Sequence, residues 1–291
     1  MNDSPAPVSV VVPTYSRPRE LAVCLRSLSA LRYPRTRLEV IVVDDGNADP
    51  VAPVVAASRG DLDVTVLRQV NGGPARARNA GAERAAGDLI AFTDDDCAPA
   101  PDWLGALTAR GAGSAEAAVG GRTVNASPAS PYATATTLLI DYLMERYNSS
   151  PGASPGAARF LPSSNLLVPA AGFRAVGGFD TAFSFPGGED REFCERWRRQ
   201  GFTMTYAPEA VVHHTSAARL GPFLRQHFNY GRGASRLQRA GLRANEPASF
   251  YIDLLRYPFS VAPRGRAIRL SALLVVCQLA TAAGYLRDRA S

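Results

Sequence analysis

The sequence predicts an α/β fold in which a mostly parallel sheet carries helices on both faces. Short apolar runs alternate with segments of helical periodicity over the first hundred residues, and polar or acidic residues follow several of those runs. A strand buried on both faces reads as an unbroken apolar run, and its alternation with helices is typical of βαβ units. The polar residues then mark strand ends, where open α/β sheets bind ligands.

The first half of the chain supplies four of the expected strands. VSVVVPTY (8–15) and LEVIVVDDG (38–46) are apolar runs, and Leu21, Leu25 and Leu28 recur between them at helical spacing. The helix over 74–86 carries proline in its first turn, which favours a helix start. The first half therefore continues with a strand over 63–68, the helix over 74–86 and a strand over 89–96.

The second half is interpreted in the same way. Residues 125–160 are expected to form a loop, because NSSPGASPGAARF is rich in serine, glycine and proline. The helix over 187–201 is well marked, since it begins with acidic residues and ends with arginines and Gly201. Around it we expect a strand, a short helix and a glycine turn over 163–180, and a strand over 202–215.

The composition changes at Arg219. The 291-residue chain has a net charge of +6 and contains no lysine, and 12 arginines but only three acidic residues lie beyond position 218. We therefore expect a body, 1–218, and a basic helical extension, 219–291. This charge indicates either an anionic partner, such as a membrane surface or nucleic acid, or a solvated arginine-rich helix.

Three features bear on the location of the protein. Residues 270–286 carry no charge and are at the short end of the ~17–25 residues that span a bilayer, so a packed or membrane-interface helix is favoured over a span. The four cysteines lack paired or zinc-type spacing, which fits a reducing compartment. The N-terminal residues have no basic segment before their short apolar run, unlike a signal peptide. We expect a cytoplasmic protein, with peripheral contact to the inner face of a membrane as an open alternative.

Carboxylates follow two of the expected strands. Asp94, Asp95 and Asp96 follow the fourth strand, and Asp44 and Asp45 follow the second. Like charges side by side repel, so we expect a positive partner among them. A divalent cation, Mg²⁺ or Mn²⁺, held by one or two carboxylates and by substrate phosphates would supply that charge. In an extended segment Asp94 and Asp96 would point to the same side as two ligands.

Other chemistries of clustered aspartates fit less well. Counting from Asp94, the glycine and glutamate that an EF-hand loop requires are replaced by Pro99 and Gly105. An aspartate-nucleophile phosphatase would carry its acidic pair after the first strand, which ends here in Pro-Thr-Tyr. Neither the dinucleotide-binding G-x-G-x-x-G nor the ATPase G-x-x-x-x-G-K-[ST] follows that strand.

Several short segments together carry a family resemblance. In order they are VSVVVPTYSRP, IVVDDG, GGPARARNAG, IAFTDDDC, GGFD, GGED and PEAVVHH. In this order and spacing, from about Val8 to Thr215, the sequence resembles the inverting family 2 glycosyltransferases with the GT-A fold. The resemblance implies a Rossmann-like mixed sheet, mostly parallel, and a nucleotide-sugar glycosyltransferase domain over 1–218. It also implies that the helical extension, 219–291, associates with a membrane or with a second copy.

The resemblance also implies roles for individual residues. Asp45, supported by Asp44, would recognise the nucleobase, and Arg78 and Asn79 would lie beside the nucleotide-sugar. Asp190 would be the general base, with Glu189 as the alternative. The other donor-site residues would be Pro13, Thr14, Tyr15 and Arg17 around the base and ribose, Asp94, Asp95 and Asp96 in the DxD segment at ribose, metal and diphosphate, and His214 or its neighbour His213 as a further metal or diphosphate ligand.

Each of these residues also has a purely structural interpretation. Asp44 and Asp45 precede Gly46 and could belong to a turn. Glu189 and Asp190 could complement a helix dipole. The adjacent histidines alternate faces on a strand, so one of them is expected to be structural.

The expected reaction is a single displacement. Loss of a nucleoside diphosphate from the anomeric carbon builds negative charge that a divalent cation neutralises, while a carboxylate takes the proton of the attacking hydroxyl. A UDP-sugar donor is weakly favoured, and a lipid-linked, metabolite or peptide acceptor is open; no nucleic-acid partner is expected. The lack of a separate Gln-x-x-Arg-Trp segment favours the addition of one sugar or a few. The alternatives are a non-catalytic nucleotide-sugar binding module and a sugar nucleotidyltransferase, although the lysine-containing glycine-rich loop of the latter is missing.

Overall fold

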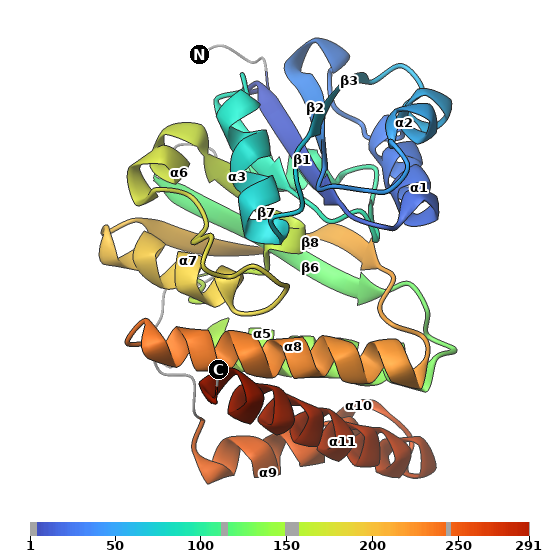
Figure 1. Cartoon of the computed structure of the whole chain (residues 1–291), viewed down its shortest axis with the longest axis vertical. Coiled ribbons are helices and arrows are strands. Elements are labelled where there is room, and N and C mark those ends of the chain that lie inside the picture. Colours follow the sequence, from blue (N-terminus) through green and yellow to red (C-terminus); the bar gives the residue numbers. More distant parts are fainter. Residues whose placement is uncertain (1–4, 112–115, 149–156, 243–245, 291) are drawn as a thin grey trace.

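The computed structural model describes residues 5–111, 116–148, 157–242 and 246–290. Its centre is a sheet of eight strands in the order β3-β2-β1-β4-β7-β6-β8-β5 (Figure 1). Neighbouring strands are parallel, except that β7 runs antiparallel to β4 and β6, and β5 runs antiparallel to β8. The predicted mixed, mostly parallel sheet is confirmed. The strands are β1 (Val8–Thr14), β2 (Leu38–Asp44), β3 (Asp63–Arg68), β4 (Leu89–Phe92), β5 (Cys97–Pro99), β6 (Ala117–Asn125), β7 (Leu166–Pro169) and β8 (Thr203–His214).

Helices cover both faces of the sheet because successive side chains of each strand point to opposite sides. Val10 and Val12 of β1 pack in one core with Leu25 of the first helix, whereas Val11 packs in the other core with Ala77 of the third. The helices of the first core are α1 (Pro18–Ser29), α2 (Ala52–Ser58) and α4 (Trp103–Gly111), and those of the second are α3 (Pro74–Arg84), α6 (Ala170–Val176) and α7 (Glu189–Arg199).

The C-terminal extension forms a helical layer beside this body (Figure 1). Its long helix α11 (Arg264–Arg289) lies along α8 (Leu220–Arg239), and α9 (Ala248–Arg256) and α10 (Pro258–Val261) pack against α11. A third apolar core joins these helices to α5 (Pro131–Asn148) of the body. The extension is therefore packed onto the body through α5 and α8.

The prediction of a loop over 125–160 is wrong for half of that segment, because Pro131–Asn148 is the helix α5. Its buried residues Ala135, Leu138, Leu139 and Tyr142 recur at helical spacing, so the helical pattern was present in the sequence. The glycine- and proline-rich composition of the following stretch concealed it. Residues 149–156 of that stretch lie outside the described part of the chain.

Candidate active site

The predicted site residues gather where β1, β2 and β4 end at one edge of the sheet. β1 and β2 are in register from Val8 and Leu38 to Thr14 and Asp44, so their polar ends are adjacent. β8 runs to the same place, because its last residue, His214, pairs with Cys97 immediately after the three aspartates. α7 begins with Glu189 and Asp190 and adds two more carboxylates.

The three aspartates form a turn rather than an extended segment. β4 ends at Phe92, and the backbone N–H of Cys97 donates to the carbonyl of Asp94 at 3.1 Å. The expectation that Asp94 and Asp96 project to one side of a strand is therefore wrong. In the turn Asp94 meets Arg78, whereas Asp95 and Asp96 both meet Arg17.

Arg17 and Arg78 supply the positive charge that the aspartates require. Arg78 Nη2 donates to Asp94 at 2.6 Å. Arg17 approaches Asp95 at 3.3 Å through Nε and also pairs with Asp96. The Asp95 side chain is only 1% exposed and accepts a 2.8 Å hydrogen bond from Thr14 Oγ1.

Burial and these partners set the charges of the turn. Burial raises the pKa of Asp95 to about 7, although Arg17 opposes the shift. Burial would also raise the pKa of Asp96, but the nearby His214 and Arg17 outweigh it and lower that pKa to about 2. Asp96 therefore stays ionised at neutral pH, and its carboxylate lies beside His214.

Asp96 and His214 form the part of the site suited to a divalent cation. His214 Nε2 lies 3.3 Å from Asp96 Oδ1, and Ser216 Oγ contacts the other ring nitrogen at 2.9 Å, which fixes the orientation of the ring. Cys97 Sγ lies in the same group of potential ligands, all within 4.8 Å of one another. Burial raises the pKa of the Cys97 thiol well above its usual value, and hard cations prefer oxygen, so the residues fit a cation held by Asp96 and His214 with positions left for a diphosphate.

The adjacent His213 points elsewhere. It pairs with Ala98 on β5, is exposed, and alternates in facing direction with His214 along β8. Of the two histidines, His214 is the one beside the aspartate turn.

Arg78 joins the aspartate turn to the start of α7. It is 3% exposed, and its Nη1 lies 3.2 Å from Glu189 Oε1 while its Nη2 contacts Asp94. Burial and repulsion from Asp190 raise the pKa of Glu189 to about 7, against the effect of Arg78. One buried cation thus holds two acidic elements that would otherwise repel each other.

The carboxylate of Asp190 is held in orientation by Ser163. The backbone N–H and the hydroxyl of Ser163 each donate to one of its carboxylate oxygens at 3.1 Å. Burial raises the pKa of Asp190, although Arg78 and Ser163 oppose the shift. Glu189 is 4% exposed whereas Asp190 is half-buried, so Asp190 is the more accessible of the two carboxylates.

The residues predicted for base recognition already have partners in the fold. Asp45 accepts hydrogen bonds from Gln69, Asn71 and the backbone N–H groups of Gly72 and Gly73, at 2.7–3.2 Å. Asp44 accepts from the backbone and side chain of Asn47 at 2.8 and 2.7 Å. The hydrogen bonds of Asp45 hold residues 69–73 against the end of β2, and those of Asp44 hold Asn47 there.

The remaining predicted residues divide into exposed and buried groups. Tyr15 and the Arg17 side chain are 49% and 44% exposed at the surface of the protein, whereas the preceding residues Pro13 and Thr14 are buried. Asn79 exchanges two 2.8 Å hydrogen bonds with the backbone of Phe179, so its side chain fixes the turn after α6.

Sequence reasoning missed Asn47 and Ser163. Asn47 lies only three residues after Asp44 and donates its backbone N–H to that carboxylate, a short-range contact that made Asp-Asp-Gly-Asn a usable turn signal. Ser163 lies 27 residues from Asp190, and no local pattern connects the two.

Comparisons with known proteins agree with one another. The sequence pattern of "Glycosyl transferase family 2" matches residues 9–161, and that of "Glycosyl transferase family group 2" matches residues 93–284. Glycosyltransferase AglE of Haloferax volcanii is 26% identical, over 96% of this chain and 95% of that protein. Succinoglycan biosynthesis protein ExoM of Rhizobium meliloti is 30% identical, over 79% of this chain and 74% of that protein.

The chain spans only about half of some other relatives. The pre-mycofactocin glycosyltransferase of Mycobacterium tuberculosis is 30% identical, over 79% of this chain but 47% of that protein.

Among solved structures, the mannosyltransferase PcManGT from Pyrobaculum calidifontis, in complex with GDP-Man and Mn²⁺, has a TM-score of 0.68 at 18% identity, covering 99% of this chain and 89% of that one. TarS of S. aureus in complex with UDP-GlcNAc has a TM-score of 0.55 at 18% identity, covering 98% and 90%.

Proposed function

The chain belongs to glycosyltransferase family 2 and has the GT-A fold, and we propose that it moves a sugar from a nucleoside diphosphate sugar to an acceptor hydroxyl by single displacement, with Asp190 as the general base. An inverting reaction is typical of this family. One observation carries the proposal: Arg78 bridges Asp94, on the diphosphate side, to the element that begins with Glu189 and Asp190.

The residues on either side of Arg78 suit the two parts of the reaction, which are the departure of the diphosphate and the deprotonation of the acceptor hydroxyl. Arg17 lies at the mouth beside Asp95 and Asp96, where its cation can attract a diphosphate. Asp190 lies on a different element, and its raised pKa makes it a stronger base than an exposed aspartate. Ser163 holds both of its oxygens, so that the carboxylate is fixed in orientation. Glu189, which is buried against Arg78, is better placed to position that arginine than to accept a proton.

The metal proposal rests on the pair Asp96 and His214. These residues would hold Mg²⁺ or Mn²⁺, which when bound would neutralise the charge of the leaving diphosphate. A solved neighbour contains Mn²⁺ with GDP-Man and another contains UDP-GlcNAc, so donors differ among proteins of this fold. We propose a UDP-sugar for this chain, and a comparison of UDP, GDP and TDP tests the choice of base.

The decisive experiment compares donor binding with turnover. Thermal unfolding would be followed with UDP, GDP and TDP and their sugars, each with and without Mn²⁺ or Mg²⁺. A ligand at 100 times its Kd adds about 2.7 kcal/mol of stability, so we expect a metal-dependent shift with one diphosphate that Asp96→Ala abolishes. Asp190→Asn should keep that shift and lose release of the nucleoside diphosphate in the presence of acceptor.

The same experiment separates the rival functions. A non-catalytic binding module would show the shift in the wild-type protein, but no turnover with any of a panel of lipid-linked, metabolite and peptide acceptors. No shift with any nucleotide would overturn the donor site proposed here.

The location proposal rests on α11. Of the helices in the described part of the chain, α11 is long and apolar enough to cross a membrane by length and composition, but it also packs along α8 and α5. Its residues Ile268, Val275, Leu279 and Leu286 are exposed and, at spacings of 7, 4 and 7, share one side of the helix. We infer peripheral contact of this apolar stripe with the inner face of a membrane, and hence a cytoplasmic catalytic body; pairing with a second copy is the alternative.

A further inference from the structure

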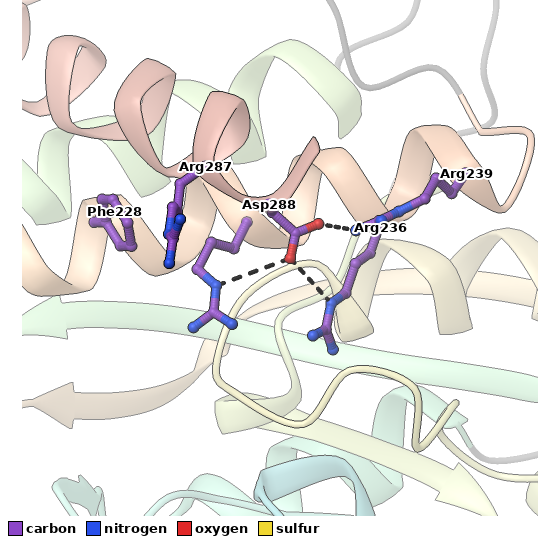
Figure 2. Close-up of a pocket in the computed structure, with 6 residues that line it drawn as sticks. Phe228, Arg236, Arg239, Arg287 and Asp288 are labelled. Carbon is purple, nitrogen blue, oxygen red and sulfur yellow. Dashed lines mark hydrogen bonds and ion pairs between the residues drawn. The ribbon is translucent and has the colours of Figure 1, made fainter. Parts of the chain in front are cut away.

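A pocket lined by arginines lies between α8 and α11, away from the aspartate turn. Its volume is about 450 Å³, within the range of ligand sites. Figure 2 shows Asp288 of α11 facing the arginines of α8, with Phe228 and Arg287 at the other end of the pocket. The lining residues are Phe228, Arg232, Arg236, Arg239, Arg287 and Asp288.

The pocket carries more positive charge than its single carboxylate can neutralise. Asp288, whose side chain is 6% exposed, pairs with Arg239 and lies 3.6 Å from Nε of Arg236 and 3.9 Å from Nε of Arg232. The last two distances exceed that of a hydrogen bond. Partial burial, followed by repulsion from Arg232 and Arg239, lowers the pKa of Arg236. Arg232, Arg236 and Arg239 thus share one aspartate, which leaves an excess of positive charge that a bound anion would relieve.

Two of the guanidinium groups are held in fixed positions by an aromatic ring. The Cζ atoms of Arg232 and Arg236 lie 3.7 and 4.1 Å from the ring centre of Phe185. Stacking of this kind restrains the planes of the guanidinium groups, so less side-chain entropy is lost when they bind a ligand. Planar guanidinium forks match the oxygens of a phosphate in pairs.

The pocket also touches the segment that leads into the candidate active site. Arg236 donates to the carbonyl of Ala182 and to Ser184 Oγ, and Phe185 follows them in the chain. Gly233 of α8 approaches Gly187 so closely that a Cβ on it would overlap the carbonyl oxygen of Gly187. Gly187 stands three residues before Asp190, so the helix that carries these arginines packs against the segment that leads to the proposed general base.

We propose that the arginine pocket binds a phosphate or diphosphate group carried by the acceptor. The proposal rests on the proposed glycosyl transfer, since it assigns an acceptor class to that site. The exposed Leu286 next to Arg287 begins the apolar stripe of α11, so the phosphate could be joined to an apolar chain as well as to a soluble molecule. Both sources present the same group to the arginines.

The test measures direct binding to the full chain in the presence of EDTA, by isothermal titration calorimetry. The probes are inorganic pyrophosphate, glycerol 3-phosphate and dioctanoyl phosphatidic acid below its micelle concentration. The pocket variant is Arg239→Gln/Arg287→Gln, which leaves the two arginines stacked on Phe185 in place. The control is Arg225→Gln/Arg289→Gln, which removes two other arginines from the same two helices.

We expect the pocket variant to bind pyrophosphate at least tenfold more weakly than the wild type and the control variant. Asp288→Asn removes the carboxylate that pairs with the arginines, so this variant should bind pyrophosphate more tightly than the wild type. A loss of folding cannot mimic such a gain. Tighter binding of phosphatidic acid than of glycerol 3-phosphate would identify a lipid-linked phosphate, and equal binding a soluble one. Equal binding of pyrophosphate by wild type and pocket variant, or none by either, would make the arginines a structural network only and overturn the proposal.

The same proteins separate this inference from the proposed donor site. The metal-dependent stabilisation by a nucleoside diphosphate should be unchanged in Arg239→Gln/Arg287→Gln, because these residues line the arginine pocket between α8 and α11 and not the aspartate turn. Loss of pyrophosphate binding with an intact nucleotide shift would support the pocket. A missing nucleotide shift in the wild type would count against the donor site and leave the pyrophosphate result to be judged by itself.

Discussion

At the scale of single residues, the candidate site is organised by one buried arginine. Arg78 is enclosed between Asp94 and Glu189, and the removal of one partner of such a buried pair typically costs about 3–5 kcal/mol. Arg17, in contrast, is 44% exposed and free to meet a ligand as well as its aspartates. We therefore expect the two cations to have different tasks, with Arg78 maintaining the geometry of the site and Arg17 available to contact a ligand.

With Asp190 as the proposed general base, its raised pKa predicts how turnover depends on pH. A general base must be ionised, so turnover is lost as the pH falls through a pKa that burial has raised above the ~4 of an exposed aspartate. Ser163→Ala removes a hydrogen bond that favours the ionised carboxylate, and should move the acid limb of the kcat profile upward by roughly one pH unit. The measurement is kcat from pH 4.5 to 9 with saturating donor.

An unchanged acid limb in Ser163→Ala would assign the limb to a different group. Thr108→Ala is a suitable control, because it also removes a partly buried hydroxyl, but one whose partners are the backbone of α4 and the side chain of Tyr33. Its kcat profile should coincide with that of the wild type.

At the scale of elements, α8 is held by close backbone contacts at glycines. A Cβ on Gly231 would overlap the carbonyl oxygen of Thr281 in α11, and one on Gly284 would overlap that of Phe228 in α8. Each glycine therefore lets one helix approach the backbone of the other. Gly221 of α8 and Gly265 of α11, by contrast, have nothing within 4 Å of an added Cβ.

This difference predicts opposite effects of the same substitution within one helix. Gly231→Ala and Gly284→Ala should lower the free energy of unfolding by about 1–3 kcal/mol or more, because the helices must separate. Gly221→Ala and Gly265→Ala should be neutral or stabilising by up to about 1 kcal/mol, since alanine is the better helix former. Urea denaturation measures all four, and destabilisation by all four alike would contradict the close packing of α8 and α11.

Elements were predictable from sequence where local pattern and tertiary context agree. The first three strands, α1, α3 and α7 follow from apolar periodicity and from the residues at the helix ends and are confirmed, whereas the fourth strand ends at Phe92 instead of residue 96. The turn of Asp94 to Asp96 could not be predicted, because the preceding apolar run suggested that the strand continued. In the fold these aspartates contact Arg17 and Arg78, which come from distant segments of the chain. Contacts such as Asp190 with Ser163 depend on the tertiary fold, and no single sequence pattern encodes them.

At the scale of the whole molecule, the chain combines a near-neutral catalytic body with a basic helical layer. The layer presents the apolar stripe of α11 with exposed arginines near its ends, which is the combination that anionic membranes attract. We predict that the protein sediments with vesicles containing phosphatidylglycerol but not with phosphatidylcholine alone, and that Leu279→Glu lowers the bound fraction severalfold. Val70→Glu, which alters an 84% exposed side chain of the body, should have no such effect. Equal binding by both variants would contradict membrane contact through the stripe.

The attachment of this layer to the body also predicts how overall stability depends on pH. His227 of α8 is fully buried between Phe223 and Tyr230, and its Nε2 lies 3.2 Å from Thr136 Oγ1 of α5. Burial lowers the pKa of His227 to about 4, so the folded chain keeps the imidazole neutral where the unfolded chain protonates it. The unfolded state therefore binds more protons between about pH 6.5 and 4, and stability falls as the pH is lowered through that window.

The loss attributable to His227 should amount to roughly 3 kcal/mol across the window. His227→Phe keeps an aromatic ring among Phe223 and Tyr230 but cannot be protonated. The variant loses the contact with Thr136 and should be less stable at neutral pH, yet its stability should fall less steeply than that of the wild type between pH 6.5 and 4. Urea denaturation of both proteins at several pH values measures the difference. Parallel curves would show that His227 is not the group whose protonation loosens the helical layer, whereas converging curves would show that acid weakens the molecule at the junction of α5 and α8.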